Sequence, residues 1–175
     1  NVSGVFAFDT GPGNMMIDEA CKRLFGKPFD AGGAIARRGA VSEGLLDELM
    51  GNPFLAKEPP KSTGREVFGA GSMDRLLSSN SNLVPEDIVR TLTEFTSASV
   101  ADACTRYVVP RVHGKIDRLV VGGGGAHNPV VLEGIARRLP QTEVMTQEDL
   151  GFSSDAKEAV AFAILGNQTL HGRPS

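Results

Sequence analysis

The chain has 175 residues, of which 41% are hydrophobic and 22% charged, an ordinary composition for one globular domain or one large lobe of a two-lobed protein. Eighteen basic and 21 acidic side chains give a net charge of −3 without a basic stripe, so nucleic acid is not an expected partner. No apolar run approaches the ~20 residues of a membrane span, which predicts a soluble, cytoplasmic protein with no membrane partner.

The first third of the chain begins with a short apolar run at residues 5–8, which predicts a strand. A turn-rich segment follows at residues 9–14. Apolar residues then recur near every 3.6 positions across residues 15–25, which predicts a helix that ends before Gly26 and Pro28.

The middle of the chain predicts more helix. A short helix is expected at residues 45–50 and another around residues 73–77. Between them, residues 51–71 contain three prolines and predict a long loop, which is a candidate functional segment. Pro85 suits the first position of a long helix whose apolar face reaches about Pro110.

The last third alternates strands with helices. Strands are predicted at residues 116–121 and 142–145, a glycine turn at 122–125, and helices at 129–139 and 156–170, the last one strongly apolar and closing the domain. This alternation predicts an α/β sandwich built on a mixed sheet that helices flank.

Cysteine and histidine usage gives no metal site. Cys21 and Cys104 are far apart and each lies in an apolar helical pattern, so both are predicted to be reduced core residues of a cytosolic protein. The chain starts at Asn1 without a charged and apolar leader, so we expect no secretory signal and a start within a longer protein. The three histidines are scattered and none is assigned a metal: His113, His127 and His171.

The first motif is the turn at residues 9–14, Asp-Thr-Gly-Pro-Gly-Asn. A carboxylate at a strand end, followed by glycines whose backbone can approach an anion, suits phosphoryl transfer. A tight turn in which Asp9 accepts local hydrogen bonds is the alternative. An aspartic protease is disfavoured because a second Asp-Thr-Gly triplet and a largely β composition are absent from the sequence.

The second motif is the run of four glycines at residues 122–125, between the predicted strand and helix. Such a turn lets the backbone lie against a nucleotide while the helix start supplies free amides and a positive dipole. Close packing of the backbone is the alternative. A dinucleotide Rossmann site is disfavoured because the run lacks the Gly-x-Gly-x-x-Gly spacing with a following ribose-binding acid.

Two further motifs are less specific. Residues 61–66, Lys-Ser-Thr-Gly-Arg-Glu, are not a P-loop because the glycine follows the lysine; the alternative is a solvated loop with Arg65 and Glu66 pairing weakly. Before the last helix, Asp155 and Glu158 are three residues apart and would share one face if both lay in the first helical turn. Simple capping, with Ser153, Ser154 and Asp155 as candidates, is the alternative there.

Taken in order, these motifs, with Asn128 and Pro129 after the glycine turn and Ala159 to Ala163 after Glu158, resemble the anhydro-N-acetylmuramic acid kinases over nearly the whole chain. The resemblance implies a ribonuclease H-like lobe of the actin-like ATPase fold, in which ATP lies in a cleft between two lobes. Residues 1–175 would be the C-terminal lobe, and the N-terminal lobe with its own phosphate loop is absent from this sequence.

For that family the resemblance implies transfer of the ATP γ-phosphate, with Mg²⁺, to O6 of a 1,6-anhydro sugar, coupled to opening of the anhydro ring by water. The product would be N-acetylmuramic acid 6-phosphate, in peptidoglycan recycling. Asp9 matches the catalytic base, and Glu158 matches a glutamate near the same water or the sugar. The cofactor-binding residues would be Thr10, Gly11, Gly13 and Asn14 toward the phosphates and Gly122, Gly123, Gly124 and Asn128 toward the nucleoside.

Other readings stay open at this point. The sugar could be levoglucosan, or the chain could be a non-catalytic, truncated nucleotide-binding module. Lys61 and Arg65 are assigned to the site only by their charge, and His127 is expected to be an exposed loop residue that could face the nucleotide. The family resemblance implies a homodimer for the full-length protein. Because phosphoryl transfer depends on positioning, residues 1–175 alone are expected to be inactive.

Overall fold

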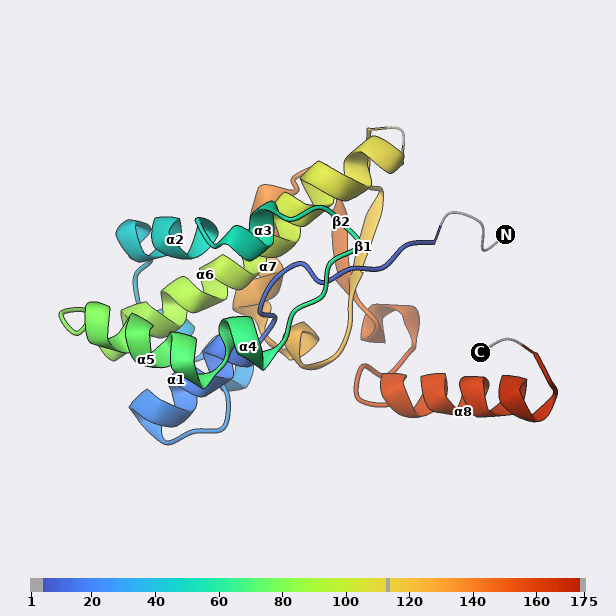
Figure 1. Cartoon of the computed structure of the whole chain (residues 1–175), viewed down its shortest axis with the longest axis horizontal. Coiled ribbons are helices and arrows are strands. Elements are labelled where there is room, and N and C mark those ends of the chain that lie inside the picture. Colours follow the sequence, from blue (N-terminus) through green and yellow to red (C-terminus); the bar gives the residue numbers. More distant parts are fainter. Residues whose placement is uncertain (1–4, 113, 174–175) are drawn as a thin grey trace.

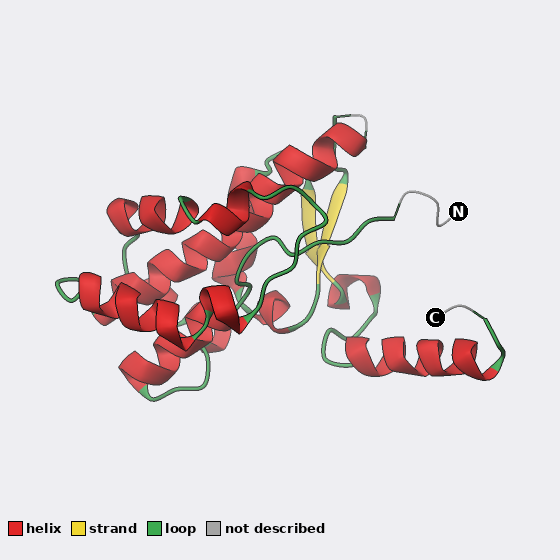
Figure 2. Cartoon of the chain, viewed as in Figure 1, coloured by secondary structure: helices red, strands yellow, loops and turns green. Residues whose placement is uncertain are grey.

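A computed structural model describes residues 5–112 and 114–173. It is an α/β structure in which helices predominate and a small sheet lies at one side of the helical body (Figures 1 and 2). The expected α/β class is confirmed. Among the described residues, the helices are α1 Met15–Phe25, α2 Glu43–Met50, α3 Pro53–Ala56, α4 Arg65–Phe68, α5 Ala70–Ser79, α6 Pro85–Ala103, α7 Pro129–Arg138 and α8 Lys157–Leu170, and the strands are β1 Arg118–Val121 and β2 Glu143–Thr146.

Helix α6 is the centre of the body. Proline at its first position and two acids in its first turn favour the start of a helix. It is buried along most of its length and packs against α1, α2 and α7 (Figure 1). Beyond Ala103 the chain continues helically as a π turn at Cys104–Val108 and a 3₁₀ turn at Val109–Arg111, so the predicted long helix is confirmed with a change of winding near its end.

The sheet consists of β1 and β2, which run parallel with Arg118 opposite Glu143 and Val121 opposite Thr146. Helix α7 makes the crossover that a parallel pair requires. The predicted order of strand, glycine turn, helix and strand is confirmed. A mixed sheet was expected, but within the described residues the sheet consists only of this parallel pair.

Two local predictions are wrong. Residues 5–8 do not form a strand, because a strand needs a neighbouring strand for its ladder hydrogen bonds and none of the described strands pairs with them. Val5 and Phe6 are accordingly 77% and 40% exposed. Residues 51–71 are not a continuous loop, since α3 and α4 lie within them. The side chain of Asn52 accepts a hydrogen bond from Phe54 N at 2.9 Å and so caps α3.

Both cysteines are buried and free, as predicted for Cys21 and Cys104. Burial, with the nearby charges of Asp30 and Asp18, raises the pKa of the Cys21 thiol to about 12. His113 lies outside the described residues. None of the described helices combines the length and apolar character that crossing a membrane would need.

Helix α8 differs from the other long helices because it lies apart from the helical body, beyond the strands (Figure 1). None of its residues is buried. Its position in the sequence is as predicted, but within the described residues it does not close over the core.

Candidate functional site

Two helices begin beside the same hollow. Asn14 precedes α1, Asn128 precedes α7, and both line a hollow of about 220 Å³. The dipole of each helix start favours negative charge nearby. The start of α7 offers no free amide, however, because Pro129 lacks an N–H group and Val130 N is bonded to Asn128. The hollow is lined by Asn14, Ile17, Asp18, Phe29, Asp30, Gly32, Gly124, His127 and Asn128.

The glycine turn lies directly against the turn that precedes α1. A Cβ atom on Gly124 would be 3.2 Å from Asn14 Nδ2, and one on Gly125 would be 3.7 Å from Asn14 Oδ1. Gly123 has φ 77°, which L side chains rarely adopt. The two glycine-containing motifs, far apart in sequence, therefore meet at Asn14.

Asn128 forms a wall of the hollow and not a free ligand. Its side chain is buried and accepts a hydrogen bond from Val130 N at 3.1 Å, which caps α7. Gly33 packs against this cap, because a Cβ there would lie 2.6 Å from Asn128 Oδ1. This contact fixes the loop after α1 on the start of α7.

Two acids of the hollow were not singled out from the sequence. Asp30 is buried, and its carboxylate accepts hydrogen bonds from Ile35 N at 2.7 Å and Ala36 N at 3.0 Å. Asp18, in the first turn of α1, has a pKa raised by burial. Its position one helical turn after Asn14 was the available signal. Asp30 holds the loop, whereas Asp18 presents a carboxyl group to the hollow.

The rim of the hollow includes a histidine–aspartate pair. His127 is exposed, as expected, and its Nε2 lies 3.1 Å from Asp155 Oδ1. The condition under which Asp155 and Glu158 would share one helical face is not met, because α8 starts at Lys157 and Asp155 precedes it. The pair instead ties the segment before α8 to the glycine turn.

None of the predicted caps accepts a hydrogen bond from an amide of α8, whose cap position is Ala156. Ser153 Oγ accepts a hydrogen bond from Ala156 N at 3.2 Å. Ser154 Oγ donates to Glu148 at 2.8 Å, away from the helix. The hydrogen bonds from Ser154 lower the pKa of Glu148 below its usual range.

Asp9 is held by the loop that precedes α4. Its Oδ2 accepts hydrogen bonds from Ser62 Oγ at 2.9 Å and Thr63 N at 2.8 Å, and Asp9 N donates to Lys61 O at 3.0 Å. These contacts fix the orientation of the carboxylate. Within residues 5–112 and 114–173, its second oxygen has no hydrogen-bond partner.

Lys61 does not offer its charge to a ligand. The side chain is buried, and Nζ donates to Leu55 O at 3.0 Å and to Phe54 O at 3.4 Å. Nζ also lies 4.9 Å from the centre of the Phe54 ring and 5.2 Å from that of Tyr107, and burial lowers its pKa. The expectation of a solvated loop at this position is wrong.

Arg65 and Glu66 are both exposed. Their expected ion pair is not found among the described residues. Neither residue lines the hollow beside the two helix starts, so the charge-based assignment of Arg65 to that hollow has no support there.

Only some of the other predicted site residues line the hollow or the groove beside it. Gly13, Gly122 and Gly124 line an adjoining groove of about 450 Å³ along β1. Gly11 packs against Ser99, since a Cβ on it would lie 2.6 Å from Ser99 Oγ. Asp9, Thr10, Gly123 and Glu158 line neither the hollow nor the groove.

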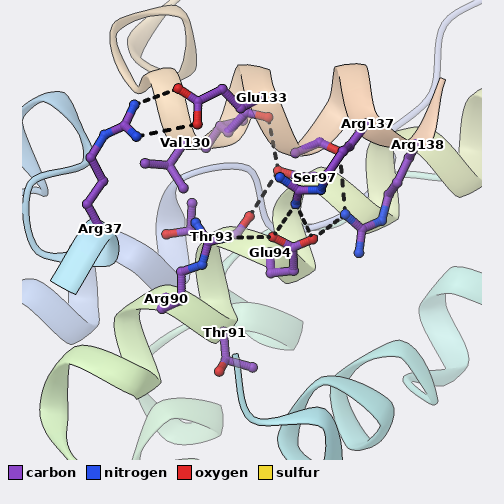
Figure 3. Close-up of polar contacts among 12 residues, drawn as sticks. Arg37, Arg90, Thr91, Thr93, Glu94, Ser97, Val130, Glu133, Arg137 and Arg138 are labelled. Atoms are coloured by element: carbon purple, nitrogen blue, oxygen red, sulfur yellow. Dashed lines mark hydrogen bonds and ion pairs between the residues drawn. The ribbon is translucent and has the colours of Figure 1, made fainter. Parts of the chain in front are cut away.

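Helix α7, which carries one side of the hollow, is fastened to α6 by a charged cluster (Figure 3). Arg137 and Arg138 both donate hydrogen bonds to the carboxylate of Glu94, the first at 2.8 Å. Arg90 forms an ion pair with the same carboxylate at 3.5 Å. Burial alone would raise the pKa of Glu94, but the hydrogen bonds from Arg138 and Arg137 outweigh it and hold the pKa below its usual range.

Close packing strengthens the same junction. Ser97 Oγ lies 3.0 Å from Val131 O, and a Cβ on Gly134 would lie 2.5 Å from Ser97 Oγ. The two helices therefore touch through a glycine. The ion pair of Arg37 with Glu133, at 2.6 Å, is exposed and joins the loop after α1 to α7 (Figure 3).

The fold and the site define the class as an α/β protein in which a glycine turn and two helix starts enclose a small-molecule site. A sequence model described as anhydro-N-acetylmuramic acid kinase matches residues 2–175. The chain belongs to the anhydro-N-acetylmuramic acid kinase family.

Several curated relatives carry the same description. The chain is 46% identical over 171 residues to anhydro-N-acetylmuramic acid kinase of Clostridioides difficile (strain 630), covering 98% of this chain and 44% of the relative. It is 47% identical over 171 residues to that of Francisella tularensis subsp. novicida, with the same coverage. It is 47% identical over 176 residues to that of Caldanaerobacter subterraneus subsp. tengcongensis, again covering 98% and 44%. The chain thus spans less than half the length of these relatives.

Proposed function

We propose that this chain is the C-terminal, nucleotide-binding lobe of an ATP-dependent kinase that phosphorylates 1,6-anhydro-N-acetylmuramic acid and opens its anhydro ring. The membership of residues 2–175 in the family carries the proposal. The hollow between the starts of α1 and α7 supports it, because a kinase needs a site for its nucleotide.

The residues of the hollow fit part of ATP. Ile17 and Phe29 offer apolar surface to a base, and Asp18 offers a carboxyl group to hydroxyl donors of a ribose. At about 220 Å³ the hollow suits a nucleoside better than a whole nucleotide. The phosphates would then lie toward Gly13 and Gly124, near the helix starts. ATP supplies the phosphoryl group, and Mg²⁺ would neutralise its charge.

Asp9 is proposed as the base. Its carboxylate is oriented by Ser62 and Thr63, which leaves one oxygen to take a proton from the water that attacks the anomeric carbon. Glu158 is proposed to lie near that water or the sugar in the complete protein. Its exposed position at the start of α8 leaves it accessible to a second lobe.

The fold of the complete protein is proposed to be ribonuclease H-like, with ATP between two lobes of actin-like ATPase type. The relatives are more than twice as long as this chain, which supports a second lobe. Losing one wall of the cleft removes positioning and charge neutralisation, so the 175-residue chain is expected to show no turnover. A homodimer of the complete protein remains part of the proposal.

Nucleotide binding tests the hollow. Titration of the chain with MgATP should show binding that Gly124→Val weakens by roughly tenfold or more, because the added side chain meets Asn14. Gly44→Val is the matched control, since nothing lies within 4 Å of a Cβ there. Equal affinities for the two variants would contradict the proposed site.

Turnover tests the activity. The full product of the gene should phosphorylate 1,6-anhydro-N-acetylmuramic acid faster than levoglucosan, and Asp9→Asn should lower kcat by roughly 10²-fold or more. Asp117→Asn is the control, because that side chain is 82% exposed and pairs only with Lys115 among the described residues. Turnover by residues 1–175 alone would refute the proposed need for a second lobe. Faster turnover of levoglucosan would identify that sugar as the preferred substrate.

A further inference from the structure

Helix α8 exposes more large apolar side chains than any other described helix. Between Lys157 and Leu170 no residue is buried. The exposed fractions are 54% for Val160, 73% for Phe162, 55% for Ile164, 42% for Leu165 and 86% for Leu170.

These side chains surround the helix. The run from 159 to 165 is Ala-Val-Ala-Phe-Ala-Ile-Leu, without a polar residue. At 3.6 residues per turn, seven consecutive apolar residues cover nearly two turns and point in all directions. A helix that is apolar all round is normally buried in the core of a protein, so α8 requires cover on several sides.

A second exposed apolar surface lies on the sheet. Within the described residues β1 pairs only with β2, and Val120 on β1 is 40% exposed. The groove of about 450 Å³ beside β1 includes Val100, Leu119 and Ile135 in its lining. Parallel sheets are normally covered on both faces, so this edge and groove also lack a covering layer.

We propose that α8 and the exposed edge of β1 form the docking surface for the rest of the polypeptide, the part that corresponds to the other half of the relatives' length. This inference rests on the two-lobe arrangement proposed above. The chain spans 44% of the Clostridioides difficile relative, so more than half of such a protein is available to cover this surface.

A second copy of the chain is the less suitable occupant. A two-fold contact would bring one partner surface against α8 and cover one side of the helix. Phe162 and Ile164 lie about 200° apart around the axis, so a single facing surface cannot cover both. A lobe of the same polypeptide can enclose the helix on several sides.

Docking on α8 would reach the candidate site. Asp155, two residues before Lys157, pairs with His127 on the rim of the hollow. Lys157 Nζ lies 3.9 Å from where a Cβ on Gly123 would be. A lobe seated on α8 therefore also borders the glycine turn.

The test measures the accessibility of α8 by thiol labelling. Phe162→Cys is introduced into the 175-residue chain and into the longest product that its gene encodes in frame. Ser79→Cys, at the exposed end of α5 away from α8, is the control in both proteins. The buried Cys21 and Cys104 give the background rate in unsubstituted protein.

The expected result is rapid labelling of Phe162→Cys in the 175-residue chain and labelling slower by roughly tenfold or more in the longer product. The control should react at similar rates in both. Equal rates for Phe162→Cys in the two proteins would overturn the proposal. Slow labelling of Phe162→Cys in the 175-residue chain, together with a dimer in sedimentation, would also overturn it, because a second copy would then be the occupant. A gene product that consists of only these residues would overturn it as well.

This labelling does not depend on catalysis. Protection of Phe162→Cys in a product that fails to phosphorylate any anhydro sugar would retain the docking surface and reject the proposed substrate. Phosphorylation by a product in which Phe162→Cys remains freely labelled would retain the kinase and reject the docking surface.

Discussion

Helices α6 and α8 are both long, yet they lie at opposite extremes of burial. Helix α6 contains the polar residues Thr93, Glu94 and Ser97, all buried, while the more apolar α8 has no buried residue. In α6 each of these polar groups has a partner, so its burial is tolerated. The difference shows that burial depends on which elements surround a helix, and that apolar sequence alone does not supply them.

The largest expected effect comes from truncating matched phenylalanines in the two helices. Phe95 is fully buried beside Phe68, so Phe95→Ala should reduce the free energy of unfolding by about 3–5 kcal/mol. Phe162 is 73% exposed, and Phe162→Ala should change the free energy of unfolding by less than about 0.5 kcal/mol. Chemical denaturation of the 175-residue chain measures both. A comparable loss in the two variants would mean that α8 is packed in solution.

The charged cluster gives the next largest effect. Glu94→Gln leaves three arginines without their carboxylate and should cost about 2–4 kcal/mol of unfolding free energy. Glu133→Gln, in an exposed pair with Arg37, should cost less than about 1 kcal/mol. If the two losses are the same, the cluster does not hold α7 in place.

Low pH should weaken the charged cluster around Glu94. The folded pKa of Glu94 lies below its ordinary value of 4.5, so its stabilising contribution is complete above that value and is lost as pH falls through the folded pKa. Between pH 6 and pH 3 the free energy of unfolding should therefore fall more in the parent protein than in the Glu94→Gln variant. Parallel pH profiles for the two proteins would contradict this assignment.

Matched glycines in α7 and α8 should respond in opposite directions. Gly134→Ala places a Cβ 2.5 Å from Ser97 Oγ and should destabilise the chain by about 1–3 kcal/mol. Gly166→Ala meets nothing within 4 Å and should stabilise α8 by up to about 1 kcal/mol. Amide hydrogen exchange resolves the two helices. A loss of protection in α8 from Gly166→Ala would show a contact there.

The smallest effect concerns the buried thiol of α1. Since the folded pKa of Cys21 is raised from 9.0 to about 12, its stabilising contribution is present below pH 9 and declines as pH rises toward 12. Cys21→Ala should lose stability less steeply than the parent chain between pH 8 and pH 10. Denaturant midpoints across this range measure the difference, and rapid alkylation of native Cys21 would argue against its burial.

Local signals predicted much of the fold. Gly26, in the left-handed conformation, ends α1 as expected, and Pro85 starts α6. The glycine turn between β1 and α7 was also correctly placed. These features depend on residues close in sequence, so composition and spacing were sufficient.

Features that depend on distant partners were not predicted. The extended run at residues 5–8 has no strand to pair with among the described residues. Lys61 is buried between the Phe54 ring and the ring of Tyr107, which is distant in sequence. The pairing of His127 with Asp155 likewise joins separate segments. For the candidate site, the sequence indicated the glycine-rich turns but not Asp18, whose importance comes from the hollow it lines.

The junction of α6 and α7 also constrains how the protein can move. Because Glu94, Ser97 and Gly134 bind the two helices at successive turns, they should behave as one rigid body. Any tightening around a bound ligand would then have to come from α1 or from the segment that leads into α8. Ligand-induced shifts in nuclear magnetic resonance spectra should accordingly concentrate in those segments and leave the facing sides of α6 and α7 unchanged.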